Sequence, residues 1–305
     1  MAATSAGGSV KTRAAALSIA SNSILIALKL TAGAITGSVA IITEAMHSSV
    51  DLIASVVAYV SVRTADKPAD EDHPYGHDKI ENLAAAIEAL LILVGSGVIV
   101  FESVRRLASG VAEVNSLGIG IGVIAFSVLA NVVVSTVLAR RARETDSPAL
   151  AGDAAHLRTD AATSAAVLVG LLVVELTGAT WLDPVIALVV AGAIVYAGIT
   201  LLMRASRVLV DEALPPEELD AVRDAIEAFG PRGVRGYHKL RARRAGSRRY
   251  VDLHVQFAGG TTLEAAHATA HQLQDAIRAR LRGADVLIHL EPEASLHPGT
   301  ELDLR

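Results

Sequence analysis

Long apolar stretches, separated by short polar segments, dominate the chain up to about residue 208. A helix that crosses the hydrocarbon core of a bilayer needs about 20 mostly apolar residues. Six stretches reach that length, at residues 13–34, 39–62, 82–106, 116–139, 149–177 and 183–203. The pattern therefore predicts an α-helical membrane domain of six transmembrane helices over residues 1–208.

A different pattern follows, rich in Arg, Asp, Glu and His. Residues 215–229 and 262–281 carry apolar side chains at helical spacing, which predicts two helices. Residues 234–244 and 248–257 alternate around a short turn as a β-hairpin would, and residues 284–292 predict a third strand. The order αββαβ predicts a small α+β domain over residues 209–305, with its helices on one face of a sheet.

Basic residues at the ends of the predicted spans indicate the orientation of the membrane domain. An even number of spans places both termini on one side, and most basic residues fall on that side. We therefore expect a multi-pass protein of the cell inner membrane or plasma membrane with both termini in the cytoplasm, and with its first span retained. The residues are Lys11, Arg13, Arg63, Lys67, Lys79, Arg140, Arg141, Arg143, Arg204 and Arg207, with Arg105 and Arg106 as exceptions.

Composition narrows the chemistry that this chain can perform. Among its 305 residues there is no cysteine, which excludes disulfides and thiolate metal sites and leaves His, Asp and Glu as metal ligands. The net charge of -5 is not typical of a nucleic-acid-binding protein. The strongest basic cluster, residues 241–249, lacks aromatic partners, so we interpret it as a solvated hairpin tip, with attraction to anionic lipid as the alternative.

Two pairs of ionisable residues interrupt the predicted spans. His47 and Asp51 in the second span, and His156 and Asp160 in the fifth, are each four residues apart and share a helix face. Burying such groups in a membrane is costly unless they are paired, so they predict a functional site. Two imidazoles and two carboxylates suit tetrahedral Zn²⁺, and protons compete with the metal for the same ligands.

A second candidate site lies in the polar segment after the second predicted span. Asp70, His73 and His77 fall within residues 67–79, where Pro74 and Gly76 bend the chain between the two histidines. Three nitrogen and oxygen ligands on a short bent loop suit a metal ion. The alternative is an acidic, solvated loop with two incidental histidines.

The C-terminal segment carries further histidines. Period-2 alternation puts His254 opposite the apolar face of its strand, while His289 and Glu291 share a face of the last strand. His267 and His271 share a helix face. Each alone is typical of a surface histidine.

Five segments together resemble the cation diffusion facilitators, in particular the bacterial zinc and iron branch of Zn²⁺/H⁺ antiporters. They are "GSVAIITEAMHSSVDLIAS", "KPADEDHPYGHDKIENLAA", "AHLRTDAATS", "DPVIALVVAGAIVYAG" and "VDEALP". The resemblance covers residues 12–292 and implies a homodimer, six spans per protomer and a ferredoxin-like cytoplasmic domain. The implied activity is proton-coupled export of Zn²⁺, with protons as the counter-substrate, membrane lipids as surroundings and no enzymatic reaction.

The resemblance also implies roles for individual residues. It places the transport site at His47, Asp51, His156 and Asp160, and the loop site at Asp70, His73 and His77. It implies zinc binding across the cytoplasmic dimer by His238, His254, His267, His289 and Glu291, with Glu291 standing where relatives have Asp. It further implies that Lys79 and Asp211 form a charge pair that locks the membrane halves of the dimer together. His271 matches none of these family positions and is a candidate extra ligand only because it shares a helix face with His267.

Three alternatives stay open at this point. An intramembrane metalloenzyme would need an open zinc position and a general base such as H-E-x-x-H, and that motif does not occur in the sequence. A membrane metal sensor would bind zinc in the tail without transport. A transporter of Mn²⁺, Fe²⁺, Co²⁺ or Cd²⁺ would share the architecture, because affinity order alone does not decide which metal is carried.

Overall fold

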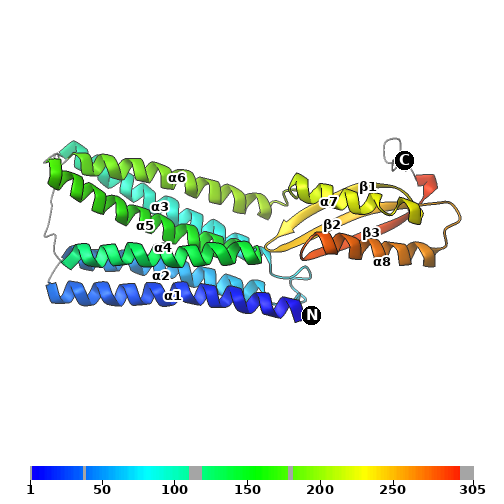
Figure 1. The fold of residues 1–305 in the computed structure, drawn as a ribbon, viewed down its shortest axis with the longest axis horizontal. Coiled ribbons are helices and arrows are strands. Elements are labelled where there is room, and N and C mark those ends of the chain that lie inside the picture. The colour runs from blue at the N-terminus through cyan, green and yellow to red at the C-terminus, as the bar shows by residue number, and fades with distance from the viewer. Residues whose placement is uncertain (1, 37–38, 110–118, 178–180, 296–305) are drawn as a thin grey trace. The chain divides into compact units, whose positions relative to one another are not determined.

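The computed structural model describes residues 2–36, 39–109, 119–177 and 181–295. The chain divides into two compact units, Met1–Ser206 and Arg207–Arg305, called here the helical unit and the α+β unit. Figure 1 shows long helices in the first unit and a sheet with helices in the second. The boundary expected after residue 208 stays a prediction.

Six long helices form the described part of the helical unit. They are α1 (Ala2–Thr36), α2 (Val39–Ala65), α3 (Lys79–Ser109), α4 (Ile119–Thr145), α5 (Pro148–Thr177) and α6 (Leu182–Leu209). Within the described residues, four stretches are long and apolar enough to cross a membrane, namely Val10–Ala32, Lys79–Arg105, Gly122–Thr145 and Pro184–Leu209. For α2 and α5, which carry the predicted transport ligands, a membrane-spanning role stays a prediction.

Small residues let these helices pack closely, and many large apolar residues are exposed on the outside of the bundle. Ala54, Ala58 and Ala89 are fully buried, as is expected where helix backbones approach one another in a membrane protein. Phe101 and Val189 are 69% and 72% exposed, and such apolar surface suits contact with lipid. The interior of the bundle also contains buried polar residues, among them Asp51, Asp153 and His156.

The α+β unit has the element order predicted from the sequence. Its elements are α7 (Pro216–Glu227), β1 (Val234–Ala245), β2 (Arg248–Phe257), α8 (Leu263–Arg280) and β3 (Ala284–Pro292), with 3₁₀ turns at Gly230–Arg232 and Glu293–Ser295. The sheet has the order β1-β2-β3, with β1 antiparallel and β3 parallel to the central strand. Both helices lie on one face of the sheet (Figure 1).

The core of this unit lies between that sheet face and the two helices. Val251, Leu253 and Val255 alternate along β2 and pack with Ile226 of α7 and Leu273 of α8. Because strand side chains alternate between faces, Asp252, His254 and Gln256 belong to the opposite face. The helix-free face of the sheet is thus the one that carries polar side chains.

The basic hairpin differs from the solvated tip that the sequence favours. Gly246, with φ of +55°, makes the turn between β1 and β2. Next to it, Arg249 is only 6% exposed, and its guanidinium donates hydrogen bonds of 2.9 and 3.0 Å to Glu218 of α7. Arg244 also donates to Glu218. These arginines therefore tie the hairpin to a helix within their own unit.

Candidate metal centres

The interior of the helical unit brings together three of the four predicted transport ligands. His156 Nε2 lies 3.5 Å from Asp51 Oδ1 and 3.8 Å from Asp160 Oδ2. The ligand atoms of the three residues all lie within 4.8 Å of one another. Asp51 and His156 are 6% and 5% exposed. His47 lies on α2 four residues before Asp51, but its side chain lies outside the described part of the structure.

These three residues line a cavity of about 530 Å³ within the bundle. Its wall also includes Asn131 of α4 and Lys29 of α1, whose ammonium donates a 2.7 Å hydrogen bond to the hydroxyl of Ser48. Other parts of the wall are apolar residues of α3. The cavity can therefore admit a cation to carboxylate and imidazole ligands that are otherwise shielded from solvent.

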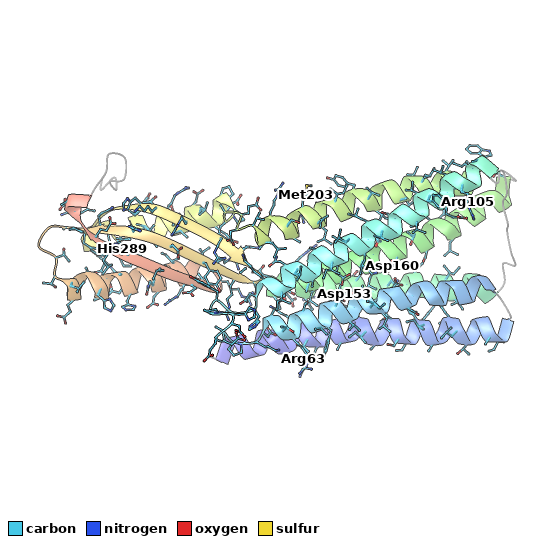
Figure 2. The ribbon with its side chains drawn as sticks, turned by 180° about the vertical axis from the view of Figure 1, so that it is seen from behind. Arg63, Arg105, Asp153, Asp160, Met203 and His289 are labelled. Carbon is cyan, nitrogen blue, oxygen red and sulfur yellow. The ribbon has the colours of Figure 1, made fainter. Side chains whose placement is uncertain are left out.

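A hydrogen-bonded network lies one helical turn before His156 on α5, nearer to the start of that helix. Ser18 and Ser55 donate hydrogen bonds of 3.1 and 3.2 Å to Asp153 Oδ1, and their hydroxyls are 2.8 Å apart. Asn22 donates a 2.8 Å hydrogen bond to Ser55. All four residues are at most 3% exposed. Figure 2 shows Asp153 and Asp160 along the same helix.

Sequence reasoning did not single out Asp153. It stands three residues before His156, just ahead of the segment "AHLRTDAATS", so it approaches the same side of the helix. An additional acidic residue inside a predicted span is the signal that could have identified it.

The loop between α2 and α3 brings its three predicted ligands together. Asp70 Oδ1 accepts a 2.7 Å hydrogen bond from the backbone N–H of His73 and lies 3.2 Å from that residue's Nδ1. Asp70 Oδ2 lies 3.3 Å from His77 Nε2. Gly76, with φ of +88°, bends the chain between the histidines. The backbone hydrogen bond from His73 is the main reason that the pKa of Asp70 is lowered.

Strand register aligns three histidines across the helix-free face of the sheet. His238 pairs with His254, and His254 pairs with His289, so one histidine from each strand lies in a row. The rings of His254 and His289 are 4.6 Å apart between centroids, and those of His238 and His254 are 5.0 Å apart. Figure 2 labels His289 on this sheet.

Glu291 connects that row of histidines. Its Oε2 lies 2.8 Å from His238 Nε2, and its Oε1 lies 2.6 Å from His254 Nδ1. His289 Nε2 lies 3.9 Å from Oε1, and the buried Gln256 donates a 3.2 Å hydrogen bond to Oε2. The hydrogen bond from His254 is the largest cause that lowers the pKa of Glu291 to about 2. The carboxylate is thus ionised and ready to share a metal with the imidazoles.

His267 lies apart from this cluster, on α8. Its Nε2 is 3.1 Å from Nε2 of His271, and the two rings are 4.4 Å apart. The role of His267 in a site across a dimer concerns a second protomer and stays a prediction.

The predicted charge pair also stays a prediction, because its members belong to different units. Lys79 begins α3 in the helical unit. Asp211 belongs to the α+β unit, where Arg243 donates a 2.9 Å hydrogen bond to its carboxylate. Asp211 therefore already has a cationic partner within its own unit.

Comparisons with known proteins cover almost the whole chain. The model of the cation efflux transmembrane domain matches residues 15–210, and that of the cation efflux protein cytoplasmic domain, a dimerisation domain, matches residues 214–293. The uncharacterized transporter sll1263 of Synechocystis sp. is 37% identical over 279 residues, which cover 91% of this chain and 89% of the relative. The cation-efflux pump FieF of Salmonella schwarzengrund is 32% identical over 291 residues, covering 93% and 94%.

One solved structure that the chain resembles is a single metal-bound domain. The metal-bound C-terminal domain of the CzcD transporter from Thermotoga maritima is 26% identical, with a TM-score of 0.24. It covers 28% of this chain and 100% of that chain.

The two family models and the full-length relatives define the class of this protein as a membrane transporter of divalent metal ions. The chain belongs to the cation efflux family. The resemblance drawn from the sequence is thereby confirmed, as is the absence of an enzymatic role.

Proposed function

We propose that this protein exports Zn²⁺ from the cytoplasm in exchange for protons, through the site formed by His47, Asp51, His156 and Asp160. The observation that carries the proposal is the approach of Asp51, His156 and Asp160, whose ligand atoms lie within 4.8 Å of one another inside the helical unit. The cavity that they line gives a transported ion access to them.

The donor set favours zinc among the divalent metals. Imidazole nitrogen and carboxylate oxygen in a four-coordinate site suit Zn²⁺, whereas Mg²⁺, Ca²⁺ and Mn²⁺ favour all-oxygen shells of higher coordination number. The same ligands explain proton exchange. A metal binds neutral imidazole and ionised carboxylate, so protons must leave when it arrives and can displace it when they return.

The α+β unit supplies metal sites that regulate or stabilise a homodimer. In this proposal His238, His254, His289 and Glu291 of one protomer bind zinc together with His267 across the dimer. Asp70, His73 and His77 hold a further ion. Both termini are cytoplasmic, and Lys79 with Asp211 links the membrane halves.

The test is transport by the purified protein in liposomes, with a zinc indicator inside and a pH indicator in the same vesicles. The wild type is expected to move Zn²⁺ inward and protons outward together. Asp51→Ala and Asp160→Ala should abolish both fluxes, whereas Glu102→Gln, on the same bundle but paired with Arg105 at 2.9 Å, should retain them. Repeating the assay with Cd²⁺, Mn²⁺, Fe²⁺ and Co²⁺ identifies the preferred metal.

Three outcomes would overturn parts of this proposal. Undiminished flux in both aspartate variants would exclude the intramembrane site. Zinc flux without proton movement would exclude exchange. Saturable zinc binding by a wild-type protein that transports nothing would instead support a metal sensor.

A further inference from the structure

Glu88 of α3 is buried deep in the helical unit and belongs to none of the sites described above. Its side chain has no solvent exposure, and neither carboxylate oxygen has a hydrogen-bond partner in the part of the chain that the structure describes. A buried carboxylate with no donor is costly when it is charged, so it requires either a proton or a nearby cation. Glu88 is therefore more than a packing residue.

The position of Glu88 is fixed by α5. A Cβ atom placed on Gly152 would lie 3.1 Å from both Cβ and Cγ of Glu88, so the missing side chain at Gly152 lets the two helices approach. Gly152 directly precedes Asp153, which begins the turn that leads to His156. The sequence therefore holds Glu88 beside the segment of α5 that supplies the transport ligands.

Ionisable groups of α5 act on Glu88 electrostatically. They are Asp153, His156 and Asp160, of which the two aspartates oppose a negative charge on Glu88 and a protonated His156 would favour one. Helix α2 also packs against α3. Its ionisable residue at the 530 Å³ cavity is Asp51, which lies beside His156.

Helix α6 also contacts α3, through Gly198 beside Leu93, and it adds little charge in this region. Between Asp183 and Arg204 the only ionisable residue in its sequence is Tyr196, which is 75% exposed. The charge of Glu88 is thus set by its burial and by the groups around His156.

Glu88 is placed to sense the metal without binding it. The residues that line the 530 Å³ cavity include Asp51, His156 and Asp160, whereas Glu88 lies outside that lining. Glu88 also does not belong to the group of Asp51, His156 and Asp160, whose ligand atoms lie within 4.8 Å of one another. Because Coulomb interactions in a poorly solvated interior extend beyond direct contact, a divalent cation at His156 would still favour the ionised form of Glu88.

We propose that Glu88 is a proton-carrying residue of the transport cycle, which holds a proton while the His156 site is empty and releases it when a divalent cation arrives. The O–H bond of the Glu88 carboxylic acid breaks, the electron pair stays on the carboxylate, and the proton leaves to water. Return of a proton reverses the step when the cation departs. The proposal rests on the proposed exchange of metal for protons and adds a group to it that never touches the metal.

The test compares Glu88→Gln with Glu102→Gln, the same substitution on the same helix, in the liposome assay. Glutamine keeps the shape that packs against Gly152 but cannot release a proton. The ratio of protons to Zn²⁺ transported is expected to fall by about one proton per ion in Glu88→Gln while Zn²⁺ is still carried, and to stay at the wild-type value in Glu102→Gln. An unchanged ratio in Glu88→Gln would overturn the inference, as would complete loss of Zn²⁺ binding, which would make Glu88 a ligand.

A second measurement uses the wild type and does not depend on the folding of a variant. Infrared difference spectra recorded on Zn²⁺ addition should show loss of the carbonyl band of a protonated carboxylic acid, and its absence would overturn the inference. A wild type that moves Zn²⁺ without protons would instead refute the proposed exchange itself, so the two failures are distinguishable.

Discussion

Nδ1 of His254 lies 2.6 Å from Oε1 of Glu291, which joins the central strand of the sheet to the edge strand β3. The other oxygen of Glu291 lies 2.8 Å from His238 on the opposite edge strand. The carboxylate of Glu291, on β3, thus contacts histidines on both of the other strands. The contact orients two imidazoles and holds an anion between them, as a metal site requires.

Glu291→Gln should weaken zinc binding by the α+β unit, because glutamine removes the negative charge and one oxygen ligand. We expect a loss of about 10- to 100-fold in affinity, measured by competition with a zinc chelator. Glu293→Gln is the matched control, since Glu293 lies two residues further and accepts a 3.0 Å hydrogen bond from the backbone of Gly259. Equal affinities in the wild type and Glu291→Gln would show that this cluster does not bind zinc.

The salt bridge between Glu218 and Arg249 should make the stability of the α+β unit depend on acid. Burial raises the pKa of Glu218, but hydrogen bonds from Arg249 and the charge of Arg244 outweigh it, so the pKa lies below the ordinary 4.5. The stabilisation is therefore fully present above about pH 4.5, the unfolded value, and is lost as pH falls through the lower folded value.

Glu218→Gln should lower the free energy of unfolding by about 2 kcal/mol at neutral pH, because it leaves the buried Arg249 without its carboxylate. The measurement is chemical denaturation of a fragment of residues 207–305 between neutral and acidic pH. The difference from the wild type should shrink on acidification, and Glu217→Gln, an exposed neighbour in the same helical turn, should show neither effect. A difference that is independent of pH would contradict the role of the Glu218 charge.

The sequence predicted the elements well because their signals are local. A long apolar stretch predicts a helix in a membrane, and alternating apolar and polar residues predict a strand. Neither prediction requires knowledge of distant contacts. The order αββαβ could be read in the same way. The start of α5 follows from equally local chemistry. Ser147 accepts a 3.3 Å hydrogen bond from the backbone N–H of Leu150, and Pro148 is the first residue of the helix.

The candidate sites could be predicted only in part, because sequence does not show which side of a buried helix meets which neighbour. His156 and Asp160 were identifiable as a pair on one face. The hydrogen bonds of Asp153 and the burial of Glu88 depend on how α1, α2 and α3 pack against α5. Similarly, the alignment of His238 with His254 depends on strand register, which includes an irregularity between His238 and Arg241.

Gly152→Ala should disturb the packing of α3 on α5. The added Cβ would lie 3.1 Å from Glu88 and 3.2 Å from the backbone of Ala85, which cannot move aside as a flexible side chain can. We expect a destabilisation of about 1–3 kcal/mol, seen as a lower Tm in detergent, together with reduced transport. Gly192→Ala on α6 is the control, because nothing lies within 4 Å of its added Cβ. An equal Tm for both variants would contradict the proposed close approach.

Asp70→Asn should remove one bound Zn²⁺ per chain from the loop without changing the ratio of protons to Zn²⁺ transported. The carboxylate of Asp70 lies within 3.3 Å of both His73 and His77. The hydrogen bond from the backbone of His73 lowers the pKa of Asp70, so the group is ionised at neutral pH, and asparagine removes the negative charge that the two histidines share. Equilibrium dialysis against Zn²⁺ counts the ions retained. Asp72→Asn, an exposed aspartate in the same loop, should retain them all. If Asp70→Asn binds as many ions as the wild type, the three loop residues are a solvated hydrogen-bonded turn and not a metal site.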